Sequence, residues 1–193
     1  MSLKLLENKK IILASKSPRR QQFFKDLGID FTVKTKEVEE IYPEELEGEE
    51  ITNYLAELKA LAFDEELQDD EILVTSDTIV WLKGKALGKP KDKKDAFMML
   101  QKLSGRKHKV ITSVCLKSKN KVLTFSETTV VHFEKLSSEE IDFYLDTYKP
   151  YDKAGSYGIQ DWIGLIGVKK IKGSYFNVVG LPVHRVYREL LNF

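Results

Sequence analysis

Short apolar runs of strand type alternate along this chain with longer stretches in which apolar residues recur at helical spacing. Residues 10–15 and 72–74 are compact apolar runs, each followed by polar residues. Between them, Ile51, Leu55 and Ala62 recur at the spacing of one helix face. Alternation of the two periods along the sequence is typical of α/β proteins, so the sequence predicts this fold class.

Residues that cap helices mark where the predicted helices begin and end. Ser17 followed by Pro18 predicts a helix start, because Ser caps the free N–H groups and Pro is tolerated in the first turn. Gly28 predicts the end of that helix. Further helices are expected after Asp92 up to Gly105, after a capping box formed by Ser137 and Glu140, and over residues 182–191.

Strands account for most of the remaining chain. Residues 30–34 alternate in strand fashion, and residues 79–87 predict a hairpin around Lys83-Gly84. Residues 107–116 and 122–133 predict two long antiparallel strands joined by a polar turn, whereas the acidic residues 39–50 predict mainly a loop. The sequence has no internal repeat and no marked boundary, so we expect one domain over residues 1–193.

The charge balance limits the classes of partner. Lys and Arg number 31 against 30 Asp and Glu, which gives a formal net charge of +1. A globally basic surface for nucleic acid or membranes is therefore not expected, and an anion site must be a local cluster of cations. The single cysteine, Cys115, lies in an apolar run and is interpreted as a buried structural thiol rather than a nucleophile.

The cellular location is predicted from what the sequence lacks. No apolar run approaches the roughly 20 residues of a membrane span. The N-terminal residues have too short an apolar stretch, and no clear cleavage site, for a signal peptide. One cysteine cannot form an internal disulfide, which suits a reducing compartment. We therefore expect a cytoplasmic protein without membrane contact.

Residues 14–20 combine Ser15, Ser17 and the pair Arg19 and Arg20 at a predicted strand-to-helix turn. The free N–H groups and the dipole of a helix N-terminus attract anions, and arginine matches phosphate oxygens with paired donors. An ordinary capped helix with solvated arginines explains the spacing equally well. Neighbours on a helix point about 100° apart, so both arginines need not touch one ligand.

Residues 75–78, Thr-Ser-Asp-Thr, are predicted to follow the end of a buried strand. Ligands of open α/β sheets bind at the carboxyl ends of strands, where Asp77 could act as a general base or metal ligand. An aspartate that merely caps a turn is the alternative.

Two further segments offer candidates of lower specificity. Lys89 lies between Gly88 and Pro90 and could hold a phosphate, although a solvated lysine explains it too. Gln160 follows a glycine-rich turn and carries both donors and acceptors for a base edge, against the alternative of a structural turn. Lys59, taken alone, is expected to be solvated, and the three histidines show no metal-ligand spacing.

Taken together, these segments resemble the Maf (septum-formation protein) family. The resemblance is carried by five motifs in the family's order, from about residue 11 to the end. They read LASKSPRR at 13–20, DTIV at 77–80 followed by LGKP at 87–90 as one motif, LSGRKHKVIT at 103–112, DKAGSYGIQ at 152–160, and GSYFNVVGLP at 173–182. Each motif alone would be weak evidence, whereas five in register are specific.

This resemblance implies a mixed, elongated sheet flanked by helices, with two lobes around a deep cleft, similar to inosine triphosphate pyrophosphatases. It also implies roles for residues that match the family's motifs. Asp77 is similar to the proposed catalytic acid/base, and Glu40, with Glu39 as the alternative in this register, to an acidic position that would share a divalent metal with it. The other matching residues are Lys59 and Lys89 as catalytic cations, and Ser15, Arg19, Arg20, Thr78 and Gln160 as substrate-binding residues.

The resemblance further implies hydrolysis of a nucleoside triphosphate to monophosphate and pyrophosphate, with Mg²⁺, Mn²⁺ or Co²⁺, as house-cleaning of nucleotide pools. Thr78 after Asp77 is similar to the branch that acts on dTTP and UTP, with CTP or modified pyrimidine nucleotides as further candidates. A homodimer is an open expectation. The alternatives are a non-catalytic nucleotide or nucleic-acid binding protein affecting cell division, a phosphatase that releases orthophosphate, and a structural interaction protein.

Overall fold

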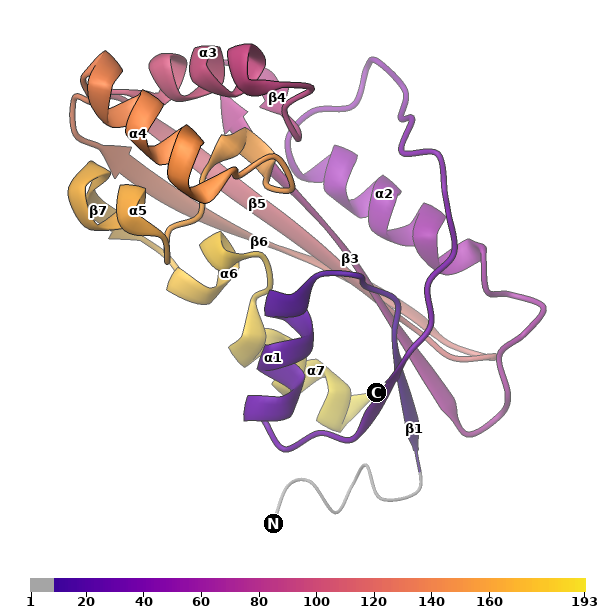
Figure 1. The fold of residues 1–193 in the computed structure, drawn as a ribbon. Coiled ribbons are helices and arrows are strands. Elements are labelled where there is room, and N and C mark those ends of the chain that lie inside the picture. Colours follow the sequence, from indigo (N-terminus) through magenta and orange to yellow (C-terminus); the bar gives the residue numbers. More distant parts are fainter. Residues whose placement is uncertain (1–8) are drawn as a thin grey trace. The chain divides into compact units, whose positions relative to one another are not determined.

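The computed structural model describes residues 9–193, so the expectation about a signal peptide, which rests on residues 1–15, lies partly outside the described residues. Figure 1 shows the elements in sequence colours. In chain order they are β1 (Lys10–Leu13), α1 (Pro18–Asp26), β2 (Phe31–Val33), α2 (Glu49–Leu61), β3 (Glu71–Leu82), β4 (Lys85–Leu87), α3 (Lys93–Leu103), β5 (Lys107–Lys117), β6 (Val122–Phe133), α4 (Ser138–Tyr148), a 3₁₀ helix (Ala154–Ser156), α5 (Trp162–Gly167), β7 (Val168–Lys172), α6 (Tyr175–Val179) and α7 (Val183–Asn192).

The strands form one seven-stranded mixed sheet in the order β2-β1-β3-β5-β6-β7, with β4 paired to β3. β1 runs parallel to both β2 and β3, whereas β3 and β4, and likewise β6 and β7, are antiparallel. Helices flank this sheet, which confirms the predicted mixed α/β class.

The chain divides into two compact units that are discontinuous in sequence. Unit 1 consists of the chain up to Asp77 together with Thr112–Glu127 and Gly180–Phe193, and unit 2 consists of Thr78–Ile111 and Thr128–Val179. The strands β3, β5 and β6 each contribute residues to both units. The single domain expected from the sequence stays a prediction.

Unit 1 packs apolar residues on both faces of its strands. Ile11 and Leu13 of β1 point to one face, where they pack with Phe24 of α1 and with Val186 of α7. Ile12 points to the other face and packs against α2. This alternation follows from the two-residue period of a strand. Figure 1 shows α1 and α7 side by side, as their shared cluster requires.

Cys115 of β5 belongs to the α2 side of this core and is fully buried. Burial raises the pKa of its thiol. A thiol that is buried and protonated is a poor nucleophile, so the interpretation of Cys115 as a structural residue is confirmed.

The capping signals predicted from the sequence are confirmed at several helix ends. Ser17 caps α1 by accepting the Arg20 N–H, and Asp92 caps α3 by accepting the Asp95 N–H. The Ser137 and Glu140 capping box of α4 is present in both directions. The predicted β3–β4 hairpin also forms, and its turn residues, Lys83 and Gly84, have φ values of 50° and 78°.

The course of β3 differs from the prediction that the strand ends near Val74. The strand continues to Leu82, so Thr75, Ser76 and Asp77 lie within it. The neighbouring β1 is the strand that ends here, since its pairing with β3 stops at Leu13 and Val74. Asp77 therefore lies beyond the carboxyl end of β1 rather than beyond the end of its own strand.

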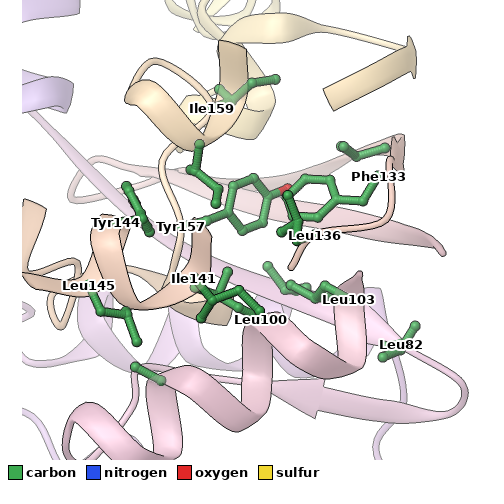
Figure 2. Packing of buried hydrophobic residues seen from close by; sticks show 14 of the residues in the cluster. Leu82, Leu100, Leu103, Phe133, Leu136, Ile141, Tyr144, Leu145, Tyr157 and Ile159 are labelled. Atoms are coloured by element: carbon green, nitrogen blue, oxygen red, sulfur yellow. The ribbon is translucent and has the colours of Figure 1, made fainter. Parts of the chain in front are cut away.

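The core of unit 2 is built where α3 and α4 pack together. Figure 2 shows Leu100 and Leu103 of α3 close to Ile141 and Leu145 of α4, with Tyr144, Tyr157 and Phe133 in the same cluster. His108 of β5 is buried in this cluster. Its Nε2 atom lies 2.7 Å from the Tyr157 hydroxyl, and its ring stands edge-on to those of Phe133 and Tyr157.

His108 should make the fold sensitive to acid. Burial, with a smaller contribution from His132, lowers the pKa of His108 from 6.5 to about 4. Between these values the His108 imidazole is protonated in the unfolded chain but not in the folded chain. The free energy of unfolding therefore falls as the pH drops from 6.5 to 4. The expected loss from this one group is about 3 kcal/mol, measured by urea unfolding across that range.

The variant His108→Gln should flatten this pH dependence, because glutamine does not titrate. His184→Gln, on the exposed side of α7, is the matched control and should leave the slope as in the unchanged protein. If the His108→Gln protein unfolds with the same pH slope as the control, another group is responsible for the acid sensitivity.

Candidate functional site

The site begins with Lys59 in the last turn of α2. Its ammonium Nζ lies 2.6 Å from Asp77 Oδ1 and 2.9 Å from Glu40 Oε1. The Lys59 side chain is only 19% exposed and that of Asp77 only 9%. Two carboxylates from segments far apart in sequence thus share one cation, within unit 1.

The apolar face of α2 explains how Lys59 reaches this position. Leu55, Ala56 and Ala60 bury that face, and the Ala56 carbonyl accepts a hydrogen bond from the Thr75 hydroxyl. Since Thr75 and Asp77 lie two residues apart on β3, both side chains point to the α2 side of the sheet. The interpretation of Lys59 as a solvated side chain, made from its spacing alone, is wrong.

Glu40 rather than Glu39 is the acidic residue whose carboxylate contacts Lys59. Both residues lie in the predicted acidic loop, where no helix or strand forms before Glu49. The sequence leaves the two registers open because a loop of this kind has no periodicity. The ion pair shows that Glu40 contacts Lys59, whereas its match to the family's acidic position stays a prediction.

A second part of the site lies at the N-terminus of α1. Ser15 is buried, and its hydroxyl accepts the Ser17 N–H at 3.2 Å. The nine residues of α1 follow, with Pro18 first and the half-buried Arg19 and Arg20 next. The predicted strand-to-helix turn is thus present, and it places two arginines in the first turn, where the helix dipole favours an anion.

Arg20 makes contacts that sequence spacing does not reveal. Its Nε donates to the Gly180 carbonyl at 2.9 Å, and its Nη1 donates to the Ser76 carbonyl at 3.1 Å. Burial lowers the pKa of Arg20 to about 10, opposed by the charges of Asp77 and Glu40, so the guanidinium stays charged at neutral pH. Arg20 therefore connects the start of α1 to the residue before Asp77.

The remaining predicted residues belong to unit 2. Thr78 is half-buried on β3, and Lys89 is exposed just after β4. Gln160 is exposed in the turn before α5. The Gly155 N–H donates to the Gly88 carbonyl at 3.0 Å, so the glycine-rich turn is bonded to the segment that carries Lys89. Six of the nine predicted residues thus lie in unit 1 and three in unit 2.

The chemistry of the carboxylates bears on the metal that the sequence implies. Within residues 9–193, no cluster of three or more His, Cys, Asp or Glu side chains is present that could hold a metal ion. Mg²⁺ in enzymes that act on phosphates is usually held by one or two carboxylates together with phosphate oxygens and water. The pair of Asp77 and Glu40 fits a cation that arrives with a phosphate ligand.

Sequence reasoning missed two residues that shape the turn around Gln160. Tyr144 of α4 is fully buried, and its hydroxyl donates to Asp161 Oδ2 at 2.7 Å. The Tyr144 hydroxyl oxygen in turn accepts the Gly158 N–H at 3.1 Å. No local pattern marks these contacts, because Tyr144 occupies an ordinary core position of its helix. The Gly180 carbonyl, which binds Arg20, lies in the motif GSYFNVVGLP, but no local pattern marks its contact with Arg20.

The helices of the described residues 9–193 include none that is both long enough and apolar enough to cross a membrane.

Comparison with known proteins gives consistent relatives. The family model described as Maf-like protein matches residues 10–193. A dTTP/UTP pyrophosphatase of Flavobacterium psychrophilum is 64% identical over 192 residues, which cover 100% of this chain and 98% of the relative. A dTTP/UTP pyrophosphatase of Flavobacterium johnsoniae is 59% identical over 185 residues, or 96% of this chain and 95% of the relative.

A solved structure supports the fold class. The Ham1 protein of Staphylococcus aureus matches with a TM-score of 0.53 and 17% sequence identity, over 94% of this chain and 100% of that chain. At this identity the likeness concerns the fold alone.

Proposed function

The chain belongs to the family of Maf-like proteins, and from this premise we propose that it is a nucleoside triphosphate pyrophosphatase. Its relatives with 59–64% identity are named dTTP/UTP pyrophosphatases, and the same reaction is proposed here. The substrate would be dTTP or UTP, with CTP or modified pyrimidine nucleotides as further candidates. The products would be the nucleoside monophosphate and pyrophosphate, and the activity would clear unwanted nucleotides from the cytoplasmic pool.

One observation supports this reaction most directly: the Lys59 ammonium lies between the carboxylates of Asp77 and Glu40, and Arg20 donates to the carbonyl of Ser76 next to Asp77. Two cationic side chains and two carboxylates therefore lie close together in space, although they come from separate segments of the sequence. A triphosphate needs cations to offset its charge, whereas an attacking water needs a base. This part of unit 1 supplies both.

The proposed chemical step uses Asp77 as the general base. Asp77 would orient a water and accept its proton while the water oxygen forms a bond to the α-phosphorus. The bond from the α-phosphorus to the oxygen that bridges to the β-phosphorus would break, and pyrophosphate would leave with that oxygen. The Lys59 ammonium would hold the Asp77 carboxylate in place. The same ammonium would also stabilise the negative charge that develops on the phosphate oxygens.

Cationic side chains and hydroxyl groups would bind the triphosphate. Ser15 and Arg19, at the N-terminus of α1, are proposed phosphate ligands together with Lys89 of unit 2, and Arg20 would add its charge from its position on the Ser76 and Gly180 carbonyls. Thr78 and Gln160 are proposed to contact the base. These assignments rest on the match of these residues to the family's motifs.

Asp77 and Glu40 would hold the divalent cation, for which Mg²⁺, Mn²⁺ and Co²⁺ are candidates. When bound, such a cation would offset charge on the phosphate oxygens.

The products test the proposal. The purified protein is incubated with Mg²⁺ or Mn²⁺ and a panel of dTTP, UTP, CTP, dCTP, ATP and GTP, and the products are separated by ion exchange. We expect monophosphate and pyrophosphate in equal amounts, with dTTP and UTP turned over fastest. Size-exclusion chromatography of the same preparation tests the homodimer expected from the sequence.

The same assay separates the alternatives. If the products are nucleoside diphosphate and orthophosphate, the protein is a phosphatase that uses the same residues rather than a pyrophosphatase. Binding without any product would favour a nucleotide-binding protein, and a steep salt dependence of nucleic-acid affinity would favour a role on nucleic acid.

A further inference from the structure

The turn that carries Gln160 is built around one buried hydroxyl. Tyr144 Oη accepts the Gly158 N–H and donates to Asp161 Oδ2, so a single phenol holds the residues on either side of Gln160 within the turn. Burial, and then the bond to Asp161, raise the pKa of Tyr144, so the phenol keeps the proton that it donates. Lys153 Nζ lies 3.9 Å from the same carboxylate oxygen of Asp161.

The helix that carries Tyr144 is itself fixed in the core of unit 2. Figure 2 shows Tyr144 between the α4 residues Ile141 and Leu145 and the turn that carries Tyr157 and Ile159. All five side chains belong to one cluster of buried residues. A hydroxyl presented from such a cluster has a fixed position, because core side chains occupy single rotamers at high packing density.

Two glycines bring the turn close to its surroundings. A Cβ added at Gly158 would lie 2.7 Å from Gln160 Nε2 and 2.6 Å from Asp161 Oδ2. The Gln160 amide is therefore folded directly over the Gly158 Cα. A Cβ at Gly164 in α5 would collide with the Ile159 carbonyl oxygen, so α5 packs directly against the backbone of the turn.

The Tyr144 hydroxyl thus holds the turn on either side of Gln160, and the exposed Gln160 amide lies against the Gly158 backbone. An amide that recognises a base by hydrogen bonds discriminates only when its donor and acceptor are fixed before binding, since ordering a free side chain offsets the gain. The amide would otherwise rotate and accept several bases.

We propose that Tyr144, Gly158 and Asp161 are positioning residues for Gln160 and that they set the base preference of the nucleotide site. This inference rests on the proposed function, in which Gln160 contacts the base. None of the three residues needs to touch the nucleotide, because each acts through the place that it gives to the Gln160 amide.

Gly158→Ala is the most direct test. The backbone of Gly158 does not have a positive φ, and the atoms that the new methyl would meet are the ends of two flexible side chains. The fold should therefore survive while the Gln160 amide is displaced. We expect the ratio of kcat/KM for dTTP over dCTP to fall by roughly tenfold or more, through KM, with kcat within about threefold.

Tyr144→Phe removes the hydroxyl and should change the ratio in the same direction. Asp161→Asn keeps an oxygen that can accept from the phenol and should retain most of the preference. The control is Tyr148→Phe, one turn later on α4, which removes a hydroxyl from the ring that stacks on Tyr144. It should leave the preference unchanged.

A double substitution distinguishes positioning from general loosening of the fold. Gly158→Ala in a Gln160→Ala background should cause no further loss of preference, because the residue that it displaces is gone. Additive losses, or an unchanged preference in a folded Gly158→Ala protein, would overturn the inference. A loss of kcat without a change of preference would overturn it as well.

A measurement without substrate separates this inference from the proposed function. The side-chain amide of Gln160, observed by ¹⁵N NMR, should give one sharp and dispersed pair of signals in the unchanged protein. In Tyr144→Phe and Gly158→Ala the pair should move toward the values of a solvated glutamine. Absence of pyrophosphate release in the product assay would refute the proposed function, whereas an unshifted Gln160 signal in both variants would refute the positioning role.

Discussion

The Asp77→Asn protein is expected to fold normally and to lose nearly all turnover. Asparagine has the shape of aspartate and can still accept a hydrogen bond from Lys59 through its amide oxygen, but it cannot take a proton from water. Removal of a general base lowers the rate by about 10²- to 10⁴-fold. Pyrophosphate release at saturating dTTP measures the loss, and thermal unfolding checks the fold.

Asp64→Asn is a matched control for this variant. Asp64 forms an ion pair with Lys117 at the same distance of 2.6 Å, and it is 45% exposed. It should lose some stability, because the Lys117 ammonium, only 13% exposed, loses its partner, but no activity. Full turnover by a folded Asp77→Asn protein would remove the assigned role from Asp77.

The Lys59→Met protein should show the second largest effect, on turnover and on stability together. Methionine keeps most of the length of the side chain but leaves the carboxylates of Asp77 and Glu40 facing each other without the cation between them. We expect a loss of roughly 100-fold or more in kcat/KM, because a charge that acts on the phosphates is removed. The free energy of unfolding should fall by about 1–3 kcal/mol, since a largely buried carboxylate loses its partner.

Lys119→Met serves as the control for Lys59→Met. Lys119 pairs with Asp69 at 3.0 Å, and both side chains are more than half exposed, so little change is expected in either measurement. Should Lys59→Met retain activity while losing only stability, Lys59 would be a structural residue that merely neutralises Asp77 and Glu40.

Local signals were sufficient to predict the elements that local contacts determine. The Ser17 cap, the capping box of Ser137 and Glu140, and the turn at Lys83-Gly84 depend on residues within a few positions of one another. The buried runs of β1 and of the first half of β3 follow from their apolar composition. These features are confirmed because nothing distant competes with them.

The course of β3 could not be predicted in the same way. Thr75, Ser76 and Asp77 have the composition of a turn, yet they lie in a strand because β3 continues past the end of β1 into its pairing with β4. Neighbouring strands determine this outcome, and strand propensity depends strongly on such context.

The contacts of the candidate site could not be predicted either, because they join residues that are distant in the sequence. Lys59 is 18 residues from Asp77 along the chain, and Arg20 is 160 residues from Gly180. A single sequence carries no signal for such pairings, so spacing alone suggested a solvated lysine. The family motifs contain both Arg19 and Arg20, but the contacts of Arg20 with the Ser76 and Gly180 carbonyls are visible only in the structure.

The discontinuous course of unit 1 has a consequence for synthesis on the ribosome. Unit 2 ends at Val179, so all of its residues are made before the last stretch of unit 1, which starts at Gly180. Gly180, whose carbonyl accepts the hydrogen bond from Arg20 Nε, is therefore translated long after Arg20 itself. Domains usually fold in the order in which they are translated, but here the earliest segment must wait for the latest. A chain that stops before Gly180 thus lacks one of the two carbonyls that hold Arg20 and keeps only the Ser76 carbonyl, so the start of α1 is fully held only after Gly180 has been added.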